Sequence, residues 1–324
     1  MIEFAYKDKD KTMKYIPPKF NALSEMAAID VGRLTEDEAR GILELIRWPE
    51  GIKCPHCGSE DVTRIKAKSE KIRDGLIQCN ACRGQFTVTV GTVMHRSHIT
   101  LRQWVQAFYS ICSHKKGVSA LQLQRNLGLI SYRSAWHLAH RIRLAMKLDT
   151  LASKLKGIVE VDETYIGGKP RRNRGSNKRG RETEKFPVMA LVERKGKMVS
   201  RPVEKVNAKT LKRAIKEVMN KNSTIITDEW PAYRGIGKNF KGGHKTVHHG
   251  LGEYVHDGIS TNEAESYFAL LKRGVHGSFH HISKKHFPRY CDEFSFRWNH
   301  RKVNDGERAT FAIMGAEGKR LVYK

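Results

Sequence analysis

The stretch that decides the fold reads Ile-Val-Glu-Val-Asp-Glu-Thr-Tyr-Ile-Gly-Gly and spans residues 158–168. The β-branched residues at its start indicate a buried strand, and the glycine pair indicates a turn after it. Asp162 and Glu163 interrupt the apolar pattern toward the far end. A buried carboxylate without a partner is costly, so an acid at this place indicates a partner, often a metal ion. Glu163 is expected to hydrogen-bond the turn, and a position that supports the metal ligands is the alternative.

Two later stretches carry acids in comparable settings. Thr-Ile-Ile-Thr-Asp-Glu-Trp, residues 224–230, is predicted to be a strand that ends on Asp228. The helical stretch Thr-Asn-Glu-Ala-Glu-Ser-Tyr-Phe-Ala-Leu-Leu-Lys-Arg begins at residue 261 and contains Glu265 and Lys272. These two lie about two helical turns apart, on one face and about 10 Å from each other.

The elements around these acids predict an α/β domain. Strands are expected at 158–166, 186–194 and 198–206, a helix at 208–219, and a fourth strand at 224–230. If the first and fourth strands are neighbours, their terminal aspartates lie side by side. Three oxygen-donor acids suit a pair of Mg²⁺ ions. Strand-end aspartates also cap turns in many proteins, so the spacing alone leaves both interpretations open.

Charge is the strongest global feature of the chain. The 324 residues include 60 Lys and Arg against 34 Asp and Glu, for a net charge of +26. Such an excess attracts nucleic acid through its phosphates, although a ribosome-associated or merely basic protein has the same property. No run of 18 apolar residues and no signal-peptide pattern occurs, so a cytoplasmic, nucleoid-associated protein without a membrane partner is expected.

Four of the six cysteines form two Cys-x-x-Cys pairs. Two such knuckles place four thiolates around one tetrahedral ion, which predicts a structural Zn²⁺ site in a zinc ribbon. The set leaves no open position for chemistry, and His56 inside the first knuckle is interpreted as a bystander. The predicted ligands are Cys54, Cys57, Cys79 and Cys82.

Helix-turn-helix spacing follows at residues 117–146. The first helix is expected to bury Leu121, Leu123 and Leu127, and Gly128 provides the turn. The leading turns of the second helix are predicted to face DNA, and the basic run from His140 to Lys147 supports that interpretation. The predicted DNA-contacting residues there are Tyr132, Arg133, Ser134 and His137.

A strongly basic loop spans residues 169–185, and a solvated loop that only aids solubility is the alternative to a DNA-binding arm. Its predicted DNA contacts are Arg171, Arg172, Arg174, Lys178 and Arg179. A final helix is expected at 290–302, with Phe294 and Phe296 in the core and Arg297 toward DNA.

Together, Val-Asp-Glu-Thr-Tyr-Ile-Gly-Gly, Thr-Asp-Glu-Trp-Pro-Ala-Tyr, Thr-Asn-Glu-Ala-Glu-Ser-Tyr-Phe-Ala-Leu-Leu-Lys-Arg-Gly and Tyr-Cys-Asp-Glu-Phe-Ser-Phe-Arg-Trp-Asn-His-Arg resemble the insertion-sequence transposases of the DDE superfamily. The closer resemblance is to the ISXO-type group, in which a zinc ribbon precedes the catalytic domain. The motifs cover roughly residues 35–303 and fall in the family's order.

The resemblance implies a ribonuclease H-like catalytic fold, Mg²⁺ or Mn²⁺ as cofactor, and cut-and-insert chemistry on double-stranded DNA with terminal inverted repeats. It also implies Asp162, Asp228 and Glu265 as metal-holding acids, followed by Lys272. Asn262 and Glu263 remain alternatives for the third metal-site residue. Joining two ends requires a homodimer or larger assembly. The alternatives in function are a catalytically inactive DNA-binding regulator and a nuclease without strand transfer.

The expected organisation follows this order of motifs. It consists of a helical segment at 1–50, a zinc ribbon at 51–90, a helix-turn-helix at 91–150, a ribonuclease H-like domain at 155–303, and a tail at 304–324.

Overall fold

The strand predicted at 158–166 lies at the centre of a five-stranded sheet. The computed structural model describes residues 23–65, 74–147, 154–167, 185–247 and 261–322. The strands are arranged in the order β6-β5-β4-β7-β8. Their bounds are β4 Ile158–Ile166, β5 Phe186–Glu193, β6 Met198–Pro202, β7 Thr224–Asp228 and β8 His244–Val247.

The sheet mixes two orientations. Strands β4, β5 and β6 are antiparallel neighbours, whereas β7 runs parallel to β4, and β8 runs parallel to β7. This α/β arrangement has the strand order of the expected ribonuclease H-like fold. Sequence patterning missed β8, because His-Lys-Thr-Val has a single apolar residue at its end.

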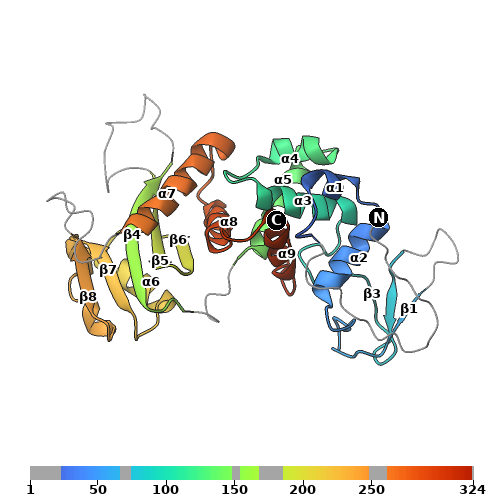
Figure 1. The fold of residues 1–324 in the computed structure, drawn as a ribbon, viewed down its shortest axis with the longest axis horizontal. Coiled ribbons are helices and arrows are strands. Elements are labelled where there is room, and N and C mark those ends of the chain that lie inside the picture. Colours follow the sequence, from blue (N-terminus) through green and yellow to red (C-terminus); the bar gives the residue numbers. More distant parts are fainter. Residues whose placement is uncertain (1–22, 66–73, 148–153, 168–184, 248–260, 323–324) are drawn as a thin grey trace.

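Helices cover both faces of the sheet (Figure 1). Helix α6, Ala208–Val218, buries the predicted stripe of Leu211, Ala214, Ile215 and Val218 against one face. Helices α7, Asn262–Gly274, and α8, Phe287–Asn299, pack on the other face. A π-helical turn, η5, continues from α7 over Val275–Phe279.

A second lobe contains the ribbon and most of the remaining helices (Figure 1). Helix α2 begins at the capping box of Thr35 and Glu38, and α3 begins in the same way at Thr100 and Gln103. The elements are α1 Ala28–Arg33, α2 Glu36–Arg47, β1 Val62–Arg64, β2 Ile77–Cys79, β3 Gln85–Phe86, α3 Leu101–Ser113, α4 Ala120–Leu127 and α5 Tyr132–Ala145.

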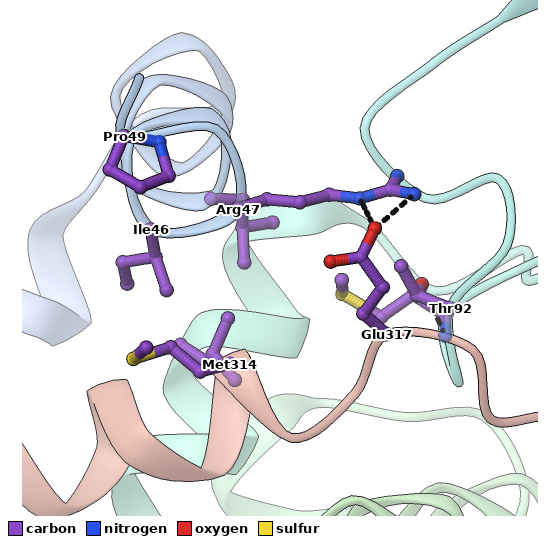
Figure 2. A pocket seen from close by; sticks show the side chains of 9 residues that line it. Ile46, Arg47, Pro49, Thr92, Met314 and Glu317 are labelled. Carbon is purple, nitrogen blue, oxygen red and sulfur yellow. Dashed lines mark hydrogen bonds and ion pairs between the residues drawn. The ribbon is translucent and has the colours of Figure 1, made fainter. Parts of the chain in front are cut away.

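The predicted tail at 304–324 instead supplies a core helix of this second lobe. Helix α9, Asp305–Met314, packs on α3 and α2 and buries Ala309, Ala312 and Ile313. Arg47 of α2 donates to Glu317 beside Met314 at a small hollow between the two helices (Figure 2). Apolar residues at Ala309, Ala312, Ile313 and Ala316 have the spacing of a helix face, which explains the difference.

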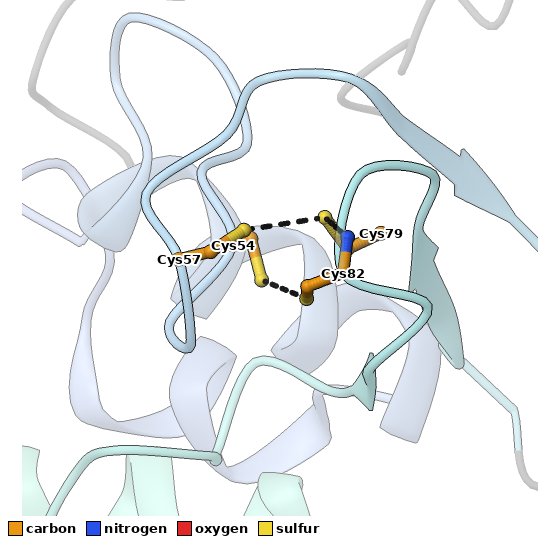
Figure 3. Close-up of side chains that lie close together, drawn as sticks. All are labelled: Cys54, Cys57, Cys79 and Cys82. Carbon is orange, nitrogen blue, oxygen red and sulfur yellow. Dashed lines mark hydrogen bonds between the residues drawn. The ribbon is translucent and has the colours of Figure 1, made fainter.

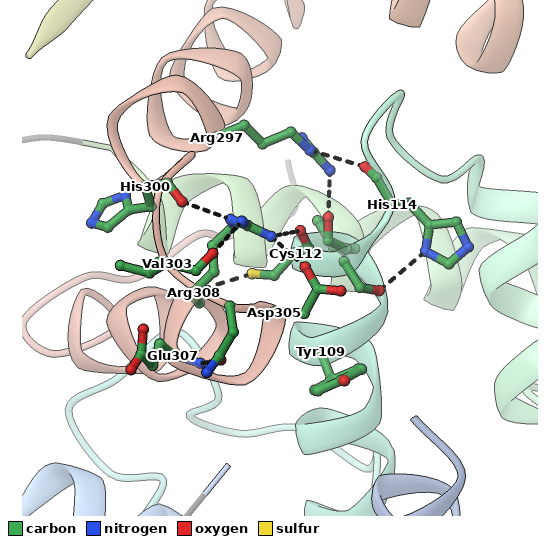
Figure 4. Close-up of polar contacts among 12 residues, drawn as sticks. Tyr109, Cys112, His114, Arg297, His300, Val303, Asp305, Glu307 and Arg308 are labelled. Carbon is green, nitrogen blue, oxygen red and sulfur yellow. Dashed lines mark hydrogen bonds and ion pairs between the residues drawn. The ribbon is translucent and has the colours of Figure 1, made fainter. Parts of the chain in front are cut away.

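Arginines fasten α9 and α8 to the end of α3. Arg308 donates to the carbonyl oxygens of Cys112 and His300, and Arg297 donates to those of His114 and Ile111 (Figure 4). The last carbonyls of a helix have no partner within it, so these guanidinium groups satisfy acceptors that burial would otherwise leave unpaired. Arg297 is therefore a buried residue that joins α8 to α3, and the prediction that it contacts DNA was wrong.

The basic run from His140 to Lys147, at the C-terminal end of α5, is also largely internal. His140, Arg141 and Arg143 are buried, and Arg143 Nε lies 2.5 Å from Glu293 Oε2 on α8. Glu293 also accepts from Arg297 Nη1 at 2.5 Å, so one buried carboxylate serves two guanidinium groups. These charges hold its pKa below the usual value even though burial acts to raise it. The expectation that this run supports DNA binding was wrong for these three residues.

This buried ion triad leads to a stability prediction. Glu293→Gln leaves two buried guanidinium groups without their counter-charge, so we expect the free energy of unfolding to fall by about 3–5 kcal/mol. Urea denaturation followed by circular dichroism measures it. The matched control is Glu217→Gln, which breaks the exposed pair with Arg201 and is expected to cost about 0–1 kcal/mol. Equal stability of the two variants would contradict the role of the triad.

Candidate metal centre and catalytic site

The four predicted cysteines converge at one end of the second lobe (Figure 3). Their sulfur atoms lie within 4.8 Å of one another, with Cys54 Sγ 3.7 Å from Cys82 Sγ and Cys57 Sγ 3.6 Å from Cys79 Sγ. A tetrahedral ion with Zn–S bonds of about 2.3 Å requires S···S separations of about 3.8 Å. The donor set therefore fits a structural Zn²⁺.

Local backbone geometry shapes both knuckles. Gly58 adopts φ +77° and donates its N–H to the carbonyl of Cys54. A Cβ at Gly84 would lie 3.0 Å from the ring of His56. His56 is not a member of the four-sulfur group, and its ring meets Phe86 edge to face. Its interpretation as a bystander agrees with this packing.

The register of β4 and β7 sets the relation between the two predicted aspartates. Ile158 pairs with Thr224 and Glu160 with Ile226. Continuing this register by two residues brings Asp162 level with Asp228, with both side chains on the α7 face of the sheet. Each accepts a backbone N–H through Oδ1, Asp162 from Glu163 at 2.7 Å and Asp228 from Trp230 at 3.2 Å. Both residues are half-buried.

Glu163 points to the opposite face, as strand alternation requires. Its carboxylate accepts from the hydroxyl of Tyr233, in the short helix η2, Pro231–Tyr233. Burial raises the pKa of Tyr233 well above its usual value, and Glu163, Asp228 and Asp162 raise it further. Glu163 was expected to bond the turn after β4, and the structure gives it Tyr233 as a partner. Sequence patterning missed Tyr233, although this tyrosine is the last residue of the Trp-Pro-Ala-Tyr motif.

Helix α7 is held to β4 by a residue that sequence patterning also missed. Glu160 is 1% exposed and accepts the N–H of Glu263 at 3.1 Å and Arg194 Nη2 at 3.3 Å. Its burial raises its pKa, and these donors oppose that effect. A carboxylate at a helix N-terminus is stabilised by the unpaired N–H groups there. Glu160 lies on the same face of β4 as Asp162, because residues two apart on a strand share a face. That spacing was the signal in the sequence that could have identified Glu160.

The two flanks of α7 face different parts of the sheet. Tyr267 bonds Ser200 on β6 at 2.5 Å, and Glu263 Oε1 accepts from Lys195 N in the β5–β6 turn at 3.4 Å. Glu265 and Lys272 each follow a buried residue and lie on the other flank, both exposed. That flank faces away from β6, which in the order of the strands is the side of β4 and β7. Asn262 is exposed on the first turn.

The three predicted acids do not form a tight cluster. Within the described ranges, the four cysteines alone bring three or more ligand atoms within 4.8 Å of one another. Hard carboxylate oxygens on neighbouring strands nevertheless suit Mg²⁺ or Mn²⁺ by donor type.

The helix-turn-helix forms as expected, except that Leu121 is 45% exposed. Gly128 has φ +63° and ends α4, and Ser131 caps α5. Tyr132, Arg133 and Ser134 are exposed on its first turn, and His137 is half-buried with a pKa lowered by burial. The basic arm residues Arg171, Arg172, Arg174, Lys178 and Arg179 lie outside the described residues.

Comparisons with known proteins agree with this architecture. Residues 154–299 match the ISXO2-like transposase domain, and residues 34–85 match the transposase zinc-ribbon domain. The chain belongs to the ISXO2-like transposases. The zinc-ribbon match includes α2, so this helix belongs with the ribbon in the transposase.

The transposase is 29% identical over 276 residues to an uncharacterized protein in the transposable element ISH50 of Halobacterium salinarum. The alignment covers 82% of this chain and 91% of that protein. A crystal structure of a pre-cleavage Mos1 transpososome overlaps with a TM-score of 0.24 at 15% identity, covering 63% of this chain and 75% of that one. An overlap of that quality has no bearing on the fold. No helix in the described part of the transposase is long and apolar enough to cross a bilayer.

The zinc ribbon leads to a metal-content prediction. Cys79→Ser removes one of four thiolates, so we expect the purified protein to lose its equivalent of zinc, as measured by mass spectrometry of the metal. Protease cleavage between residues 48 and 90 should accelerate, because metal binding stabilises such small domains. The control His56→Ala should keep its zinc. Full zinc in Cys79→Ser protein would rule out the four-sulfur site.

Proposed function

We propose that this transposase binds the terminal inverted repeats of its own insertion sequence, hydrolyses the 3′ phosphodiester at each end, and joins the ends to target DNA. The observation that carries the proposal is the register that aligns Asp162 with Asp228 inside a domain of the transposase family. The net charge of +26 supports binding to DNA. Joining two ends calls for at least a homodimer, acting at the nucleoid.

The helix-turn-helix is proposed to read the repeats. Tyr132 and Arg133 extend outward from the first turn of α5, where a recognition helix meets base edges and phosphates. The rest of α5 is packed against α8 and α3, so its leading turns form the reading surface. The arm at 169–185 is proposed to add phosphate contacts.

Asp162 and Asp228 are proposed to hold the catalytic metal ions, with Glu265 as the third acid. The flank of α7 favours Glu265 among the candidates, because Glu263 is directed toward the β5–β6 turn and Asn262 lies further round the helix from the buried stripe. Lys272 lies on the same flank as Glu265 and is proposed to contact a phosphate beside the reacting one.

Bound Mg²⁺ or Mn²⁺ ions would activate the attacking hydroxyl and stabilise the leaving oxygen. The chain positions the groups for this in-line displacement. Glu160 fixes the start of α7 against β4, and Tyr233 holds Glu163 on the opposite face, away from Asp162. Hydrolysis and strand transfer are the same displacement with different nucleophiles, so one site serves both.

The two aspartates lead to the principal test. In Asp162→Asn or Asp228→Asn protein, cleavage of linear DNA that contains the gene and its flanking sequence should fall more than about a hundredfold in Mg²⁺ or Mn²⁺. Gel electrophoresis of cut and joined products measures it. Glu229→Gln, an exposed acid next to Asp228, is the control and should retain activity.

The outcomes distinguish the rival functions. Undiminished activity in either aspartate variant would refute the proposed mechanism. Repeat binding by the wild-type chain without cleavage would indicate a regulator, and cleavage of any branched duplex without joined products would indicate a nuclease.

The third acid has its own test. Glu265→Gln should lower cleavage about a hundredfold, because it removes a charged ligand from the exposed flank without affecting packing. Glu263→Gln and Asn262→Ala should stay within about tenfold of the wild type. Metal titrations of the cleavage rate should show a raised metal requirement for Glu265→Gln alone. If Asn262→Ala shows the larger loss, the assignment moves to that residue.

A further inference from the structure

The outer side of α6 carries a concentration of positive charge that the proposed function does not use. Lys209, Arg213 and Lys216 are exposed there, on the side of the helix that faces away from the sheet. Together with Lys154, Lys212 and Glu217, they line an open hollow of about 690 Å³. We name Lys154, Lys209, Lys212, Arg213 and Lys216 the α6 basic face.

Little within the protein balances this charge. The carboxylate of Glu217 lies 2.9 Å from Arg201 Nη1 on β6. Lys212 Nζ donates to the carbonyl of Arg234, and Lys154 Nζ donates to that of Lys216. Among the residues that the structure describes, Lys209, Arg213 and Lys216 have no carboxylate within ion-pair distance. The α6 basic face therefore presents positive charge that is available to an external polyanion.

The spacing of these residues has a cost. Lys209, Lys212, Arg213 and Lys216 recur at three- and four-residue intervals, so like charges lie next to each other on the helix surface. Such pairs destabilise a helix, whereas alternating signs would stabilise it. A face that served only solubility would gain from interspersed acids. The apolar stripe of α6 holds the helix in place despite this repulsion.

The α6 basic face is connected to the edge of the sheet where β4 carries Asp162 and Glu163. The Arg234 carbonyl that Lys212 contacts comes directly after Tyr233, whose hydroxyl holds Glu163 on β4. The face lies across the sheet from α7 and in a different lobe from α5 (Figure 1). A duplex bound there would approach the strand ends from a different side than a duplex read by α5.

The side chains that line the hollow identify the ligand. They are ammonium and guanidinium groups with one carboxylate, without the aromatic and amide side chains that stack on bases or read their edges. Such a surface recognises regularly spaced phosphates without sequence preference. Element ends must be recognised by sequence, whereas a target duplex needs only its backbone to be held.

We propose that the α6 basic face binds the phosphate backbone of the target DNA duplex during strand transfer. The identification of the duplex as target DNA rests on the proposed function, whereas backbone binding by this face does not.

The test uses the full chain with Lys209→Ala, Arg213→Ala and Lys216→Ala combined. The matched control combines Lys238→Ala, Lys241→Ala and Lys245→Ala, three exposed cations near the β8 edge of the same domain. Both variants lose three positive charges, so a difference in their DNA affinity shows that the position of the charges matters and not only their number. Fluorescence anisotropy with a labelled duplex of random sequence measures binding over a series of KCl concentrations.

For the α6 variant we expect affinity for the random duplex to fall about tenfold or more. The plot of log K against log salt should become shallower by about 2.7, because each phosphate that is no longer neutralised reduces the slope by about 0.9. Its melting temperature should match or exceed that of the wild type, because like-charge repulsion is relieved. Cleavage of DNA that contains the gene and its flanks should persist, while joining to a target plasmid falls about tenfold.

Three results would overturn the proposal. They are equal loss of binding in both variants, unchanged binding and salt dependence in the α6 variant, and normal joining by a variant that binds the random duplex weakly. If the wild-type chain neither cleaves nor joins DNA, the proposed function fails. The anisotropy comparison then still decides whether the α6 basic face binds duplex DNA.

Discussion

The buried carboxylate of Glu293 is the interaction on which the arrangement of the two lobes depends. It belongs to α8 of the sheet domain, yet one partner, Arg143, lies on the helix proposed to read DNA. Its second partner, Arg297, also satisfies the last carbonyls of α3. Because removing one member of such a group leaves buried charge uncompensated, the lobes resist separation more than surface contacts alone would allow. The helix proposed to read an element end is thereby held in a fixed position relative to the domain proposed to cut it.

Within the sheet domain, the candidate site depends on strand parity and on one helix terminus. Parallel pairing of β4 with β7 ends at Glu160 and Ile226, and its register continued by two residues brings Asp162 level with Asp228. Alternation sends Glu163 to Tyr233 on the far face. Glu160 sets where α7 begins. The position of that helix start also sets the direction of the flank that carries Glu265 and Lys272. The four-cysteine centre lies in the other lobe and contributes no open coordination position, so its role is structural.

Much of this architecture was predictable because local chemistry determines it. The capping box at Thr35, the stripe of α6 and the two cysteine knuckles depend on residues close together in sequence. What escaped prediction depends on distant partners. Arg143 resembles a DNA-binding residue until Glu293, 150 positions away, is placed beside it. Strand β8 lacks an apolar pattern, and its existence follows from pairing with β7. Likewise, α7 was recognised by its period, but only the contacts of Glu263 and Tyr267 show which flank faces β6 and the β5–β6 turn.

The position of α9 has a consequence for the order of events during protein synthesis. This helix completes a core that begins near residue 23, yet the whole sheet domain lies between it and α5 in the chain. A ribosome therefore finishes the strands, α7 and α8 before the second lobe obtains its last packing surface. Domains usually fold in the order in which they are made. Here the second lobe waits for a segment that is translated after the sheet domain, so its core is completed only once the sheet domain has been synthesised.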